Sequence, residues 1–397
     1  MIKVVPFKKE ENPILLPYVR FWAKVYGYWP VKSQISLRRV LILFYFMLIH
    51  VPMIIYAVNN FDNSAELCLV LCEIIPATMH YPKIFSVFWY NDLYADVLCD
   101  LETAWKLAND SNISKWHQIE KEFRISIKTT IKRSYMLTII ASFNFVVLAG
   151  LMQAIRVYGF HFNEKLTVGL HLDYLVDFRN PDHPFLFVTF LGIAYFVCNF
   201  FGMSFITINL FYFGTIKYMA TYFKYIGACI EQLDDEFDAL SDKKLITKLK
   251  EIVRLHDAAF CMVEKLNQGM SIQFIWQYVI NGFFLCIVSV NMLVVSPRPE
   301  TFAQMLGFAV VVSMDLFICS TASEMLRTEG KQIATLIWNL KWYNRSSKIV
   351  FLVQFILARS QKPVYITAGS FYTVSLESFR KVVSAGASYF TLLKTFL

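Results

Sequence analysis

Long apolar stretches recur along the chain, and their length constrains the fold more than any other feature. A helix needs about 20 apolar residues to cross a bilayer, and only helices and closed barrels satisfy their backbone hydrogen bonds within lipid. The hydrophobic fraction of 56% exceeds the roughly 45–50% of soluble domains. The sequence therefore predicts an all-α polytopic membrane protein with seven transmembrane helices, at residues 39–59, 65–90, 135–159, 185–213, 270–295, 302–326 and 366–396.

Lys and Arg are distributed unevenly among the segments between these spans. Four segments carry 28 of the 38 basic residues: the first 39 residues, 91–134, 214–268 and 327–348. The alternate connections carry almost none. Because basic residues are retained on the cytoplasmic side of a membrane, we expect a cytoplasmic N-terminus and an extracellular C-terminus.

The basic segments have the pattern of folded extensions of the spans. Apolar side chains recur at helical spacing in two of them: Leu98, Leu101, Trp105 and Leu107 in 91–134, and Tyr218, Tyr222, Ile226, Ile230 and Leu233 in 214–268. The run Ile349 to Leu357 is too short to span and predicts a half-buried cytoplasmic helix. We expect one domain over 1–397, with a cytoplasmic N-terminus (1–38), six spans (39–326), a helical anchor region (327–364) and a seventh span (365–397).

One polar stripe follows the last predicted helix. Glu377, Lys381, Ser384, Ser388, Thr391 and Thr395 recur at spacings of four and three, and therefore share one helix face. A polar line inside a membrane helix either packs against other helices or lines a water-filled path. The stripe predicts one of these two roles.

Enzyme and metal-site motifs are not found in the sequence. It has no Gly-x-Gly-x-x-Gly, phosphate loop, His-Glu-x-x-His or Cys-x-x-Cys. His161, His171 and His183 share the external segment 159–184, but their spacings match no standard metal site. We expect that segment to be a solvated lid, and we expect no enzyme activity, cofactor or metal.

A G-protein-coupled receptor also has seven spans, but its N-terminus is outside. The sequence has no Asp-Arg-Tyr at the end of the third span and no Asn-Pro-x-x-Tyr in the seventh. The eight Cys lie in predicted spans or cytoplasmic segments, which indicates reduced thiols. These features disfavour that class.

The C-terminal third resembles the closing signature of insect odorant receptors. Its order and spacing match over about 60 residues: Trp338 to Tyr343, Arg359-Ser-Gln-Lys-Pro363, Thr367-Ala-Gly-Ser-Phe371, Ser375-Leu-Glu-Ser-Phe379 and Ser388-Tyr-Phe-Thr-Leu-Leu393. Trp338 departs from the common Tyr. The ending of insect gustatory receptors fits less well, because Ser388 replaces its Thr, Lys394 interrupts its apolar run and Thr395 replaces its Gln.

The resemblance implies an odour-specific subunit of a ligand-gated, poorly selective cation channel. Such a channel is a tetramer with a shared co-receptor, in the plasma membrane of olfactory sensory neuron dendrites. The implied partners are the co-receptor, a small volatile organic ligand, the lipid bilayer and permeating monovalent and divalent cations, with no nucleic acid. The roughly 55 residues between the fourth and fifth spans are far fewer than in a co-receptor. A gustatory-type homomeric channel and, less favoured, a G-protein-coupled chemoreceptor are the alternatives.

The resemblance also implies where the pore and gate lie. Leu392 is at the position of that family's hydrophobic constriction, which blocks ions by dewetting, although Leu392 and Phe396 could instead pack against neighbouring helices. Lys394 is expected to point away from the lumen. The candidate pore and gate residues are Ser384, Ser388, Thr391, Leu392, Thr395 and Phe396.

The ligand site is expected, by analogy, in the outer half of the bundle beneath the 159–184 segment. The candidate ligand residues are Cys72, Ile75, Met79, Gly150, Gln153, Ala154, Thr189, Ile193, Phe196, Met305 and Phe308. Ionisable residues inside spans are functional candidates, and Asp315, Glu73 and His50 are the clearest. Asp315 is either a structural hydrogen-bond partner or a group that affects permeation.

Overall fold

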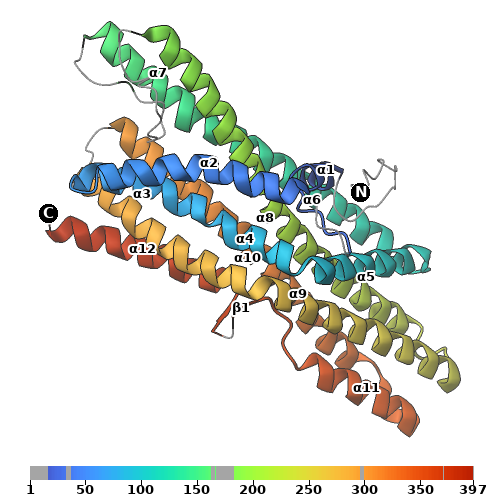
Figure 1. Cartoon of the computed structure of the whole chain (residues 1–397). Coiled ribbons are helices and arrows are strands. Elements are labelled where there is room, and N and C mark those ends of the chain that lie inside the picture. The colour runs from blue at the N-terminus through green and yellow to red at the C-terminus, as the bar shows by residue number, and fades with distance from the viewer. Residues whose placement is uncertain are drawn as a thin grey trace.

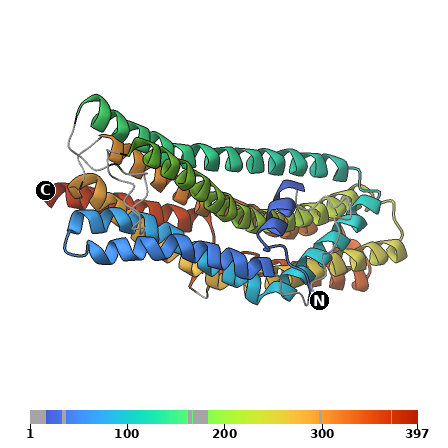
Figure 2. The same cartoon turned by 45° about the horizontal axis from the view of Figure 1, so that its top comes forward.

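The chain forms an elongated bundle of long helices that lie side by side (Figure 1, Figure 2). The computed structural model describes residues 17–32, 37–161, 166, 183–295, 299–369 and 371–396. Within these residues, six helical segments are long and apolar enough to cross a membrane. This confirms a polytopic helical membrane protein.

The first half of the chain contains short and medium helices. They are α1 (Pro17–Val25), α2 (Leu37–Asn59), α3 (Ser64–Thr78), α4 (His80–Trp89), α5 (Asn91–Asp110), α6 (Trp116–Ser142), η1 (Phe143–Leu148), α7 (Ala149–Ala154) and η2 (Ile155–Gly159). The predicted span 65–90 is divided into α3 and α4 at Met79, just after Pro76, which lacks a backbone N–H. The predicted span 135–159 runs from the end of α6 through η1, α7 and η2, of which η1 and η2 are π-helical.

The second half is built on three long helices. Its elements are α8 (Pro184–Asp235), α9 (Asp242–Val290), η3 (Asn291–Val295), α10 (Pro299–Asn339), η4 (Trp342–Asn344), α11 (Ser347–Ser360), β1 (Thr367–Ala368), β2 (Tyr372–Thr373) and α12 (Leu376–Phe396). At about 1.5 Å per residue, the 52 residues of α8 extend far beyond a hydrocarbon core of roughly 30 Å.

We extend the term anchor region from residues 327–364 to all three charged segments, at residues 91–134, 214–268 and 327–364. The predicted apolar positions Tyr218, Tyr222, Ile226, Ile230 and Leu233 are all buried there, as are Leu98, Leu101 and Trp105. The Trp105 ring centroid is 4.8 Å from that of Trp116 and 4.6 Å from that of Tyr218. Leu107 departs from the expected pattern and is 54% exposed. The amphipathic extensions are therefore real helices with an aromatic core.

The predicted start of the seventh span at residue 366 is wrong. The strands β1 and β2 form a small hairpin instead, in which Thr367 pairs with Thr373 and Ala368 with Tyr372. Gly369 turns the chain with a φ of 63°, and its N–H donates to Ser271 Oγ at 2.7 Å. Backbone bonds to α9 replace helical ones here, so α12 begins only at Leu376.

Candidate ligand cavity and C-terminal helix

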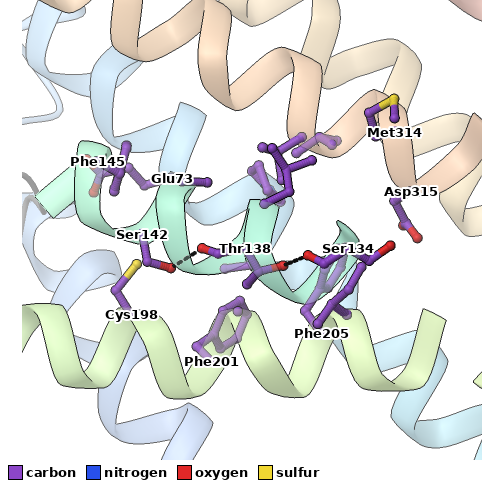
Figure 3. A pocket seen from close by; sticks show the side chains of 18 of the residues that line it. Glu73, Ser134, Thr138, Ser142, Phe145, Cys198, Phe201, Phe205, Met314 and Asp315 are labelled. Carbon is purple, nitrogen blue, oxygen red and sulfur yellow. Dashed lines mark hydrogen bonds between the residues drawn. The ribbon is translucent and has the colours of Figure 1, made fainter. Parts of the chain in front are cut away.

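A partly open cavity of about 160 Å³ lies between the membrane helices of the chain. Figure 3 shows this cavity between α6, α8 and α10. Its wall is mostly aliphatic and aromatic, with a few hydroxyl, thiol and carboxyl groups. The lining residues are Met53, Glu73, Pro76, Ala77, Ser134, Leu137, Thr138, Ala141, Ser142, Phe145, Val197, Cys198, Phe201, Gly202, Phe205, Ile206, Val311, Val312, Met314, Asp315 and Ile318.

Small residues allow α6 and α8 to approach closely along this wall. A Cβ added at Gly202 would lie 2.9 Å from Thr138 Cγ2 and 3.5 Å from Ser142 Oγ. Close approach through small residues is a common way to pack membrane helices. The large Phe201 and Phe205 side chains, which flank Gly202 on α8, fill the space beside this contact (Figure 3).

The hydroxyl groups on α6 are bonded along their own helix. Ser142 Oγ donates to the carbonyl oxygen of Thr138 at 2.9 Å, and Thr138 Oγ1 donates to that of Ser134 at 3.0 Å (Figure 3). Such bonds use the hydroxyl proton but leave the oxygen able to accept another bond. The polar side of this wall therefore offers mainly acceptors.

A buried ion pair closes one end of the cavity. Lys83 on α4 donates to Asp315 Oδ2 on α10 and, at 2.6 Å, to Asn209 Oδ1 on α8. The side chains of Lys83 and Asp315 are 1% and 2% exposed. Gln277 on α9 also donates to Asp315 Oδ2, at 2.8 Å, and the Lys83 ammonium lies 4.4 Å from the Phe205 ring centre. These contacts join four helices at one point and place Asp315 in a hydrogen-bonded structural role.

Lys83 and the lining residues of α6 are not among the residues that the sequence singled out. Lys83 could have been found, because it is an ionisable residue inside the predicted span 65–90. Its partner could not, because 232 residues separate it from Asp315. Ser134, Thr138 and Ser142 carry no signal beyond small polar residues in an apolar helix.

Four of the predicted ligand residues lie together, in a second apolar cluster beside the cavity. Cys72, Met79 and Met305 are buried there with Phe284 of α9, and Ile75 packs against them. Asn291 Nδ2 donates to Cys72 Sγ at 2.9 Å. The cluster adjoins the cavity because Val312 belongs to both.

The other predicted ligand residues are more scattered. A Cβ at Gly150 would lie 2.5 Å from Leu191 Cδ1, so Gly150 is a close contact between α7 and α8. Gln153 and Ala154 are half-buried, whereas Thr189, Ile193 and Phe196 are exposed in the single chain. The Phe308 side chain, like most of the 159–184 segment, is outside the described residues. None of the predicted ligand residues whose side chains are described lines the cavity.

The polar stripe lies on the exposed side of α12. Glu377 and Lys381 pair at 2.8 Å with both side chains exposed, and the stripe members Ser384, Ser388, Thr391 and Thr395 are also exposed. The opposite side docks on α9, where a Cβ at Gly386 would lie 2.9 Å from Leu285 Cβ. Helices of the described chain therefore leave the stripe uncovered.

The candidate gate residue Leu392 is 52% exposed on the same helix. Two hydroxyl groups of the stripe bond back to the α12 backbone: Thr391 Oγ1 donates to Ala387 O at 2.9 Å and Thr395 Oγ1 to Leu392 O at 2.6 Å. Lys394 is exposed, and the side chain of Phe396 is outside the described residues.

The bundle of long apolar helices defines a polytopic helical membrane protein, with a partly open cavity between the helices. The family model described as 7tm Odorant receptor matches residues 63–386. The chain therefore belongs to the insect odorant receptor family.

Relatives and solved structures agree with this assignment. "Putative odorant receptor 92a" of Drosophila melanogaster is 26% identical over 49% of this chain and 47% of its own length. "Odorant receptor 67c" of the same species is 24% identical over the same shares, so the chain matches about half the length of these relatives. The olfactory receptor OR5 of Machilis hrabei, solved in complex with eugenol, superposes with a TM-score of 0.71 at 14% identity, covering 96% of this chain and 99% of that one. At that identity the match concerns the fold.

Proposed function

We propose that this chain is the odour-binding subunit of a heteromeric, odorant-gated, nonselective cation channel. The observation that carries the proposal is the partly open, mainly apolar cavity of about 160 Å³, since ligand sites are concave and apolar with a few positioned polar groups. The olfactory receptor OR5 of Machilis hrabei was solved in complex with eugenol. The proposed location is the plasma membrane of olfactory sensory neuron dendrites.

The pore of this channel would be lined by α12 from each of four subunits, with a co-receptor supplying the others. A polar stripe that this chain leaves exposed needs water or another subunit, because lipid cannot satisfy its hydroxyl and charged groups. In this arrangement Ser384, Ser388, Thr391 and Thr395 face permeating cations, and Leu392 with Phe396 closes the path by dewetting. The N-terminus is cytoplasmic and the C-terminus extracellular.

A direct contact connects the cavity to this helix. Met314, Asp315 and Ile318 of α10 line the cavity, and Phe317 on the same helical turn has its ring centre 5.3 Å from that of Phe379 on α12. A ligand that binds the open arrangement better than the closed one raises the ratio of open to closed channels. This ratio changes tenfold for each ~1.4 kcal/mol of difference between the two binding free energies. A displacement of α10 by ligand is therefore transmitted to the base of α12.

The test is whole-cell current in cells that express the full chain with an insect odorant co-receptor, the chain alone, or the co-receptor alone. A panel of volatile esters, alcohols, aldehydes and aromatics is applied to each. We expect a rapid, nonselective cation current only in cells with both subunits. Current from the chain alone would instead support a homomeric channel, and the absence of odour-dependent current in cells with surface-expressed complex would contradict the proposal.

A further inference from the structure

The cavity opens to the surface of the chain between α6 and α10. Leu137 of α6 and Met314 of α10 (Figure 3) line the cavity and are 38% and 37% exposed. The other lining residues that the structure describes are buried or half-buried. Because α6 packs mainly on α8 and much less on α10, the side between α6 and α10 is left uncovered, and these two side chains form the mouth of the cavity.

The surface around the mouth is apolar. Ile140, one turn after Leu137 on α6, is 52% exposed, and Val310, one turn before Met314 on α10, is 51% exposed. All four residues lie inside the spans predicted from sequence, in which exposed apolar side chains contact hydrocarbon. The mouth is therefore surrounded by the kind of surface that faces lipid.

The mouth also lies away from the helix of the proposed pore. The α12 helix packs on α9 and α10 and the α6 helix on α8. Figure 1 shows the α6–α7 segment and α12 at opposite sides of the bundle. Subunits that meet around α12 would thus leave the mouth directed at the bilayer.

The way into the cavity from the side of the 159–184 segment is long and closely packed. Phe145, which lines the cavity, is separated from Gly159 by about 20 Å of helix at about 1.5 Å per residue. Along this stretch α7 and α8 are in tight contact, since a Cβ at Gly150 would lie 2.5 Å from Leu191 Cδ1. The second apolar cluster, buried between α3, α9 and α10, borders the cavity on another side. A ligand reaches the cavity most directly from the hydrocarbon region.

We infer that Leu137 and Met314 flank a lateral portal, through which neutral, lipid-soluble ligands enter the cavity from the bilayer. The inference rests on the cavity being the ligand site of the proposed function, and it adds the route of entry and the residues that control it. Charged molecules are excluded along this route because they would have to leave water for hydrocarbon. Apolar molecules are instead concentrated near the portal, by about fourfold for each added CH₂ group.

The first test follows a photoreactive apolar probe, 3-trifluoromethyl-3-phenyldiazirine, into the cavity. The full chain, co-purified with the co-receptor in lipid nanodiscs, is mixed rapidly with the probe and irradiated by a flash after increasing delays. Mass spectrometry quantifies adducts on Cys198 and Phe201, which line the cavity, and on Ile139, which is exposed beside it. In Leu137→Trp/Met314→Trp, which narrows the portal, we expect the cavity adducts to form severalfold more slowly and the Ile139 adducts at an unchanged rate.

The matched control is Ile140→Trp/Val310→Trp, which adds the same bulk to the same helices at exposed positions that do not line the cavity. It should leave the labelling rate of the cavity unchanged. A second variant, Leu137→Ala/Met314→Ala, widens the portal and should accelerate this labelling. Labelling at the unmodified rate in both portal variants, equal slowing in the control, or no cavity adducts in the unmodified complex would overturn the inference.

Current recordings with the panel of volatile compounds separate the two proposals. Narrowing the portal should slow the onset and the washout of the current together and leave the half-maximal concentration nearly unchanged, because a portal alters entry and exit rates but not the bound state. Odour-evoked currents combined with unchanged labelling in the narrowed variant would support the channel and overturn the portal. Slowed cavity labelling in a complex without any odour-evoked current would leave the portal intact and contradict the proposed channel function.

Discussion

Lys83 and Asp315 depend on each other because both charges are buried. Removing one partner of a buried ion pair typically costs about 3–5 kcal/mol, whereas replacing both by apolar side chains is often neutral. We therefore expect Asp315→Leu to lower the stability of the solubilised protein strongly, and Lys83→Met/Asp315→Leu to restore most of it. Thermal unfolding measures both. The control Lys248→Met breaks an exposed pair with Glu236, and should change the melting temperature little.

His256 gives the anchor region a defined acid sensitivity. Burial, the largest cause, and the nearby Arg359 guanidinium together lower the pKa of His256 from 6.5 to about 4, against an opposing effect of Asp257. The imidazole is neutral in both folded and unfolded chains above pH 6.5. Below that, the unfolded state binds the proton more readily, so stability is lost as pH falls from about 6.5 toward 4.

We accordingly expect His256→Gln to flatten the loss of stability between about pH 6.5 and 4. Melting temperatures of the two proteins across this range provide the measurement. His117 is exposed, so His117→Gln is the matched control and should leave the profile unchanged. An unaltered slope in the His256 variant would mean that other groups cause the acid sensitivity.

At the residue level, the sequence allowed the ionisable residues of the cavity wall to be predicted, but not the residues that they contact. Asp315 and Glu73 were identified because ionisable groups are rare inside spans, and both line the cavity. Phe201, Phe205 and the α6 hydroxyl groups look like ordinary membrane-helix residues, so only three-dimensional packing reveals their place in the wall. Contacts over more than 100 residues carry no periodic signal.

Among the secondary-structure elements, the connection between α11 and α12 depends most on one residue. Gly369 has a φ of 63°, and a Cβ there would lie 2.4 Å from Ile275 Cδ1 on α9. An alanine would suffer a left-handed backbone penalty of roughly 1–2 kcal/mol in addition to this clash. We expect Gly369→Ala to reduce thermal stability and the odour-evoked current together.

The control for this prediction is Gly282→Ala, toward the C-terminal end of α9. No atom lies within 4 Å of a Cβ added at Gly282, and alanine favours helix over glycine by roughly 0.5–1 kcal/mol. This variant should be neutral or slightly stabilising in the same unfolding assay. Similar losses in both variants would show that the hairpin turn is not specifically sensitive.

Helices proved far more predictable from sequence than the hairpin. Runs of apolar residues and helical spacing identified the spans and their extensions, because each signal repeats over several turns. The hairpin strands have two residues each, too few for an alternating pattern. Their position is fixed by α9 through Asn267 Oδ1, which accepts from the Thr367 N–H at 2.8 Å, and by Ser271.

At the scale of the whole molecule, glycosylation reports the proposed orientation. The sequons at Asn109, Asn112 and Asn344 all lie in segments that we place in the cytosol. Only an extracellular location exposes an Asn-x-Ser/Thr site to glycosylation. We expect no endoglycosidase-sensitive mobility shift in the expressed chain. A control with a sequon introduced after residue 397 should be glycosylated, and glycans on the native sites would contradict a cytoplasmic N-terminus.

Assembly with other subunits should involve the outer face of α11. Ile349, Val353 and Ile356 are buried on one side of this helix, yet Phe351 and Phe355 on the other are 65% and 51% exposed, with ring centres 6.4 Å apart. Exposed apolar side chains grouped outside a membrane span indicate a protein contact. A neighbouring subunit of the proposed tetramer would cover them.

We therefore expect Phe351→Glu to weaken co-purification with the co-receptor severalfold, because the interface would bury an unpaired charge, without lowering the stability of the chain itself. Leu107→Glu is the matched control, since Leu107 is a similarly exposed apolar residue on α5 of the same anchor region. Co-purification measured by quantitative immunoblot distinguishes the two. Equal recovery of both variants at wild-type level would exclude this face of α11 from the subunit contact and leave α12 as the main surface for assembly.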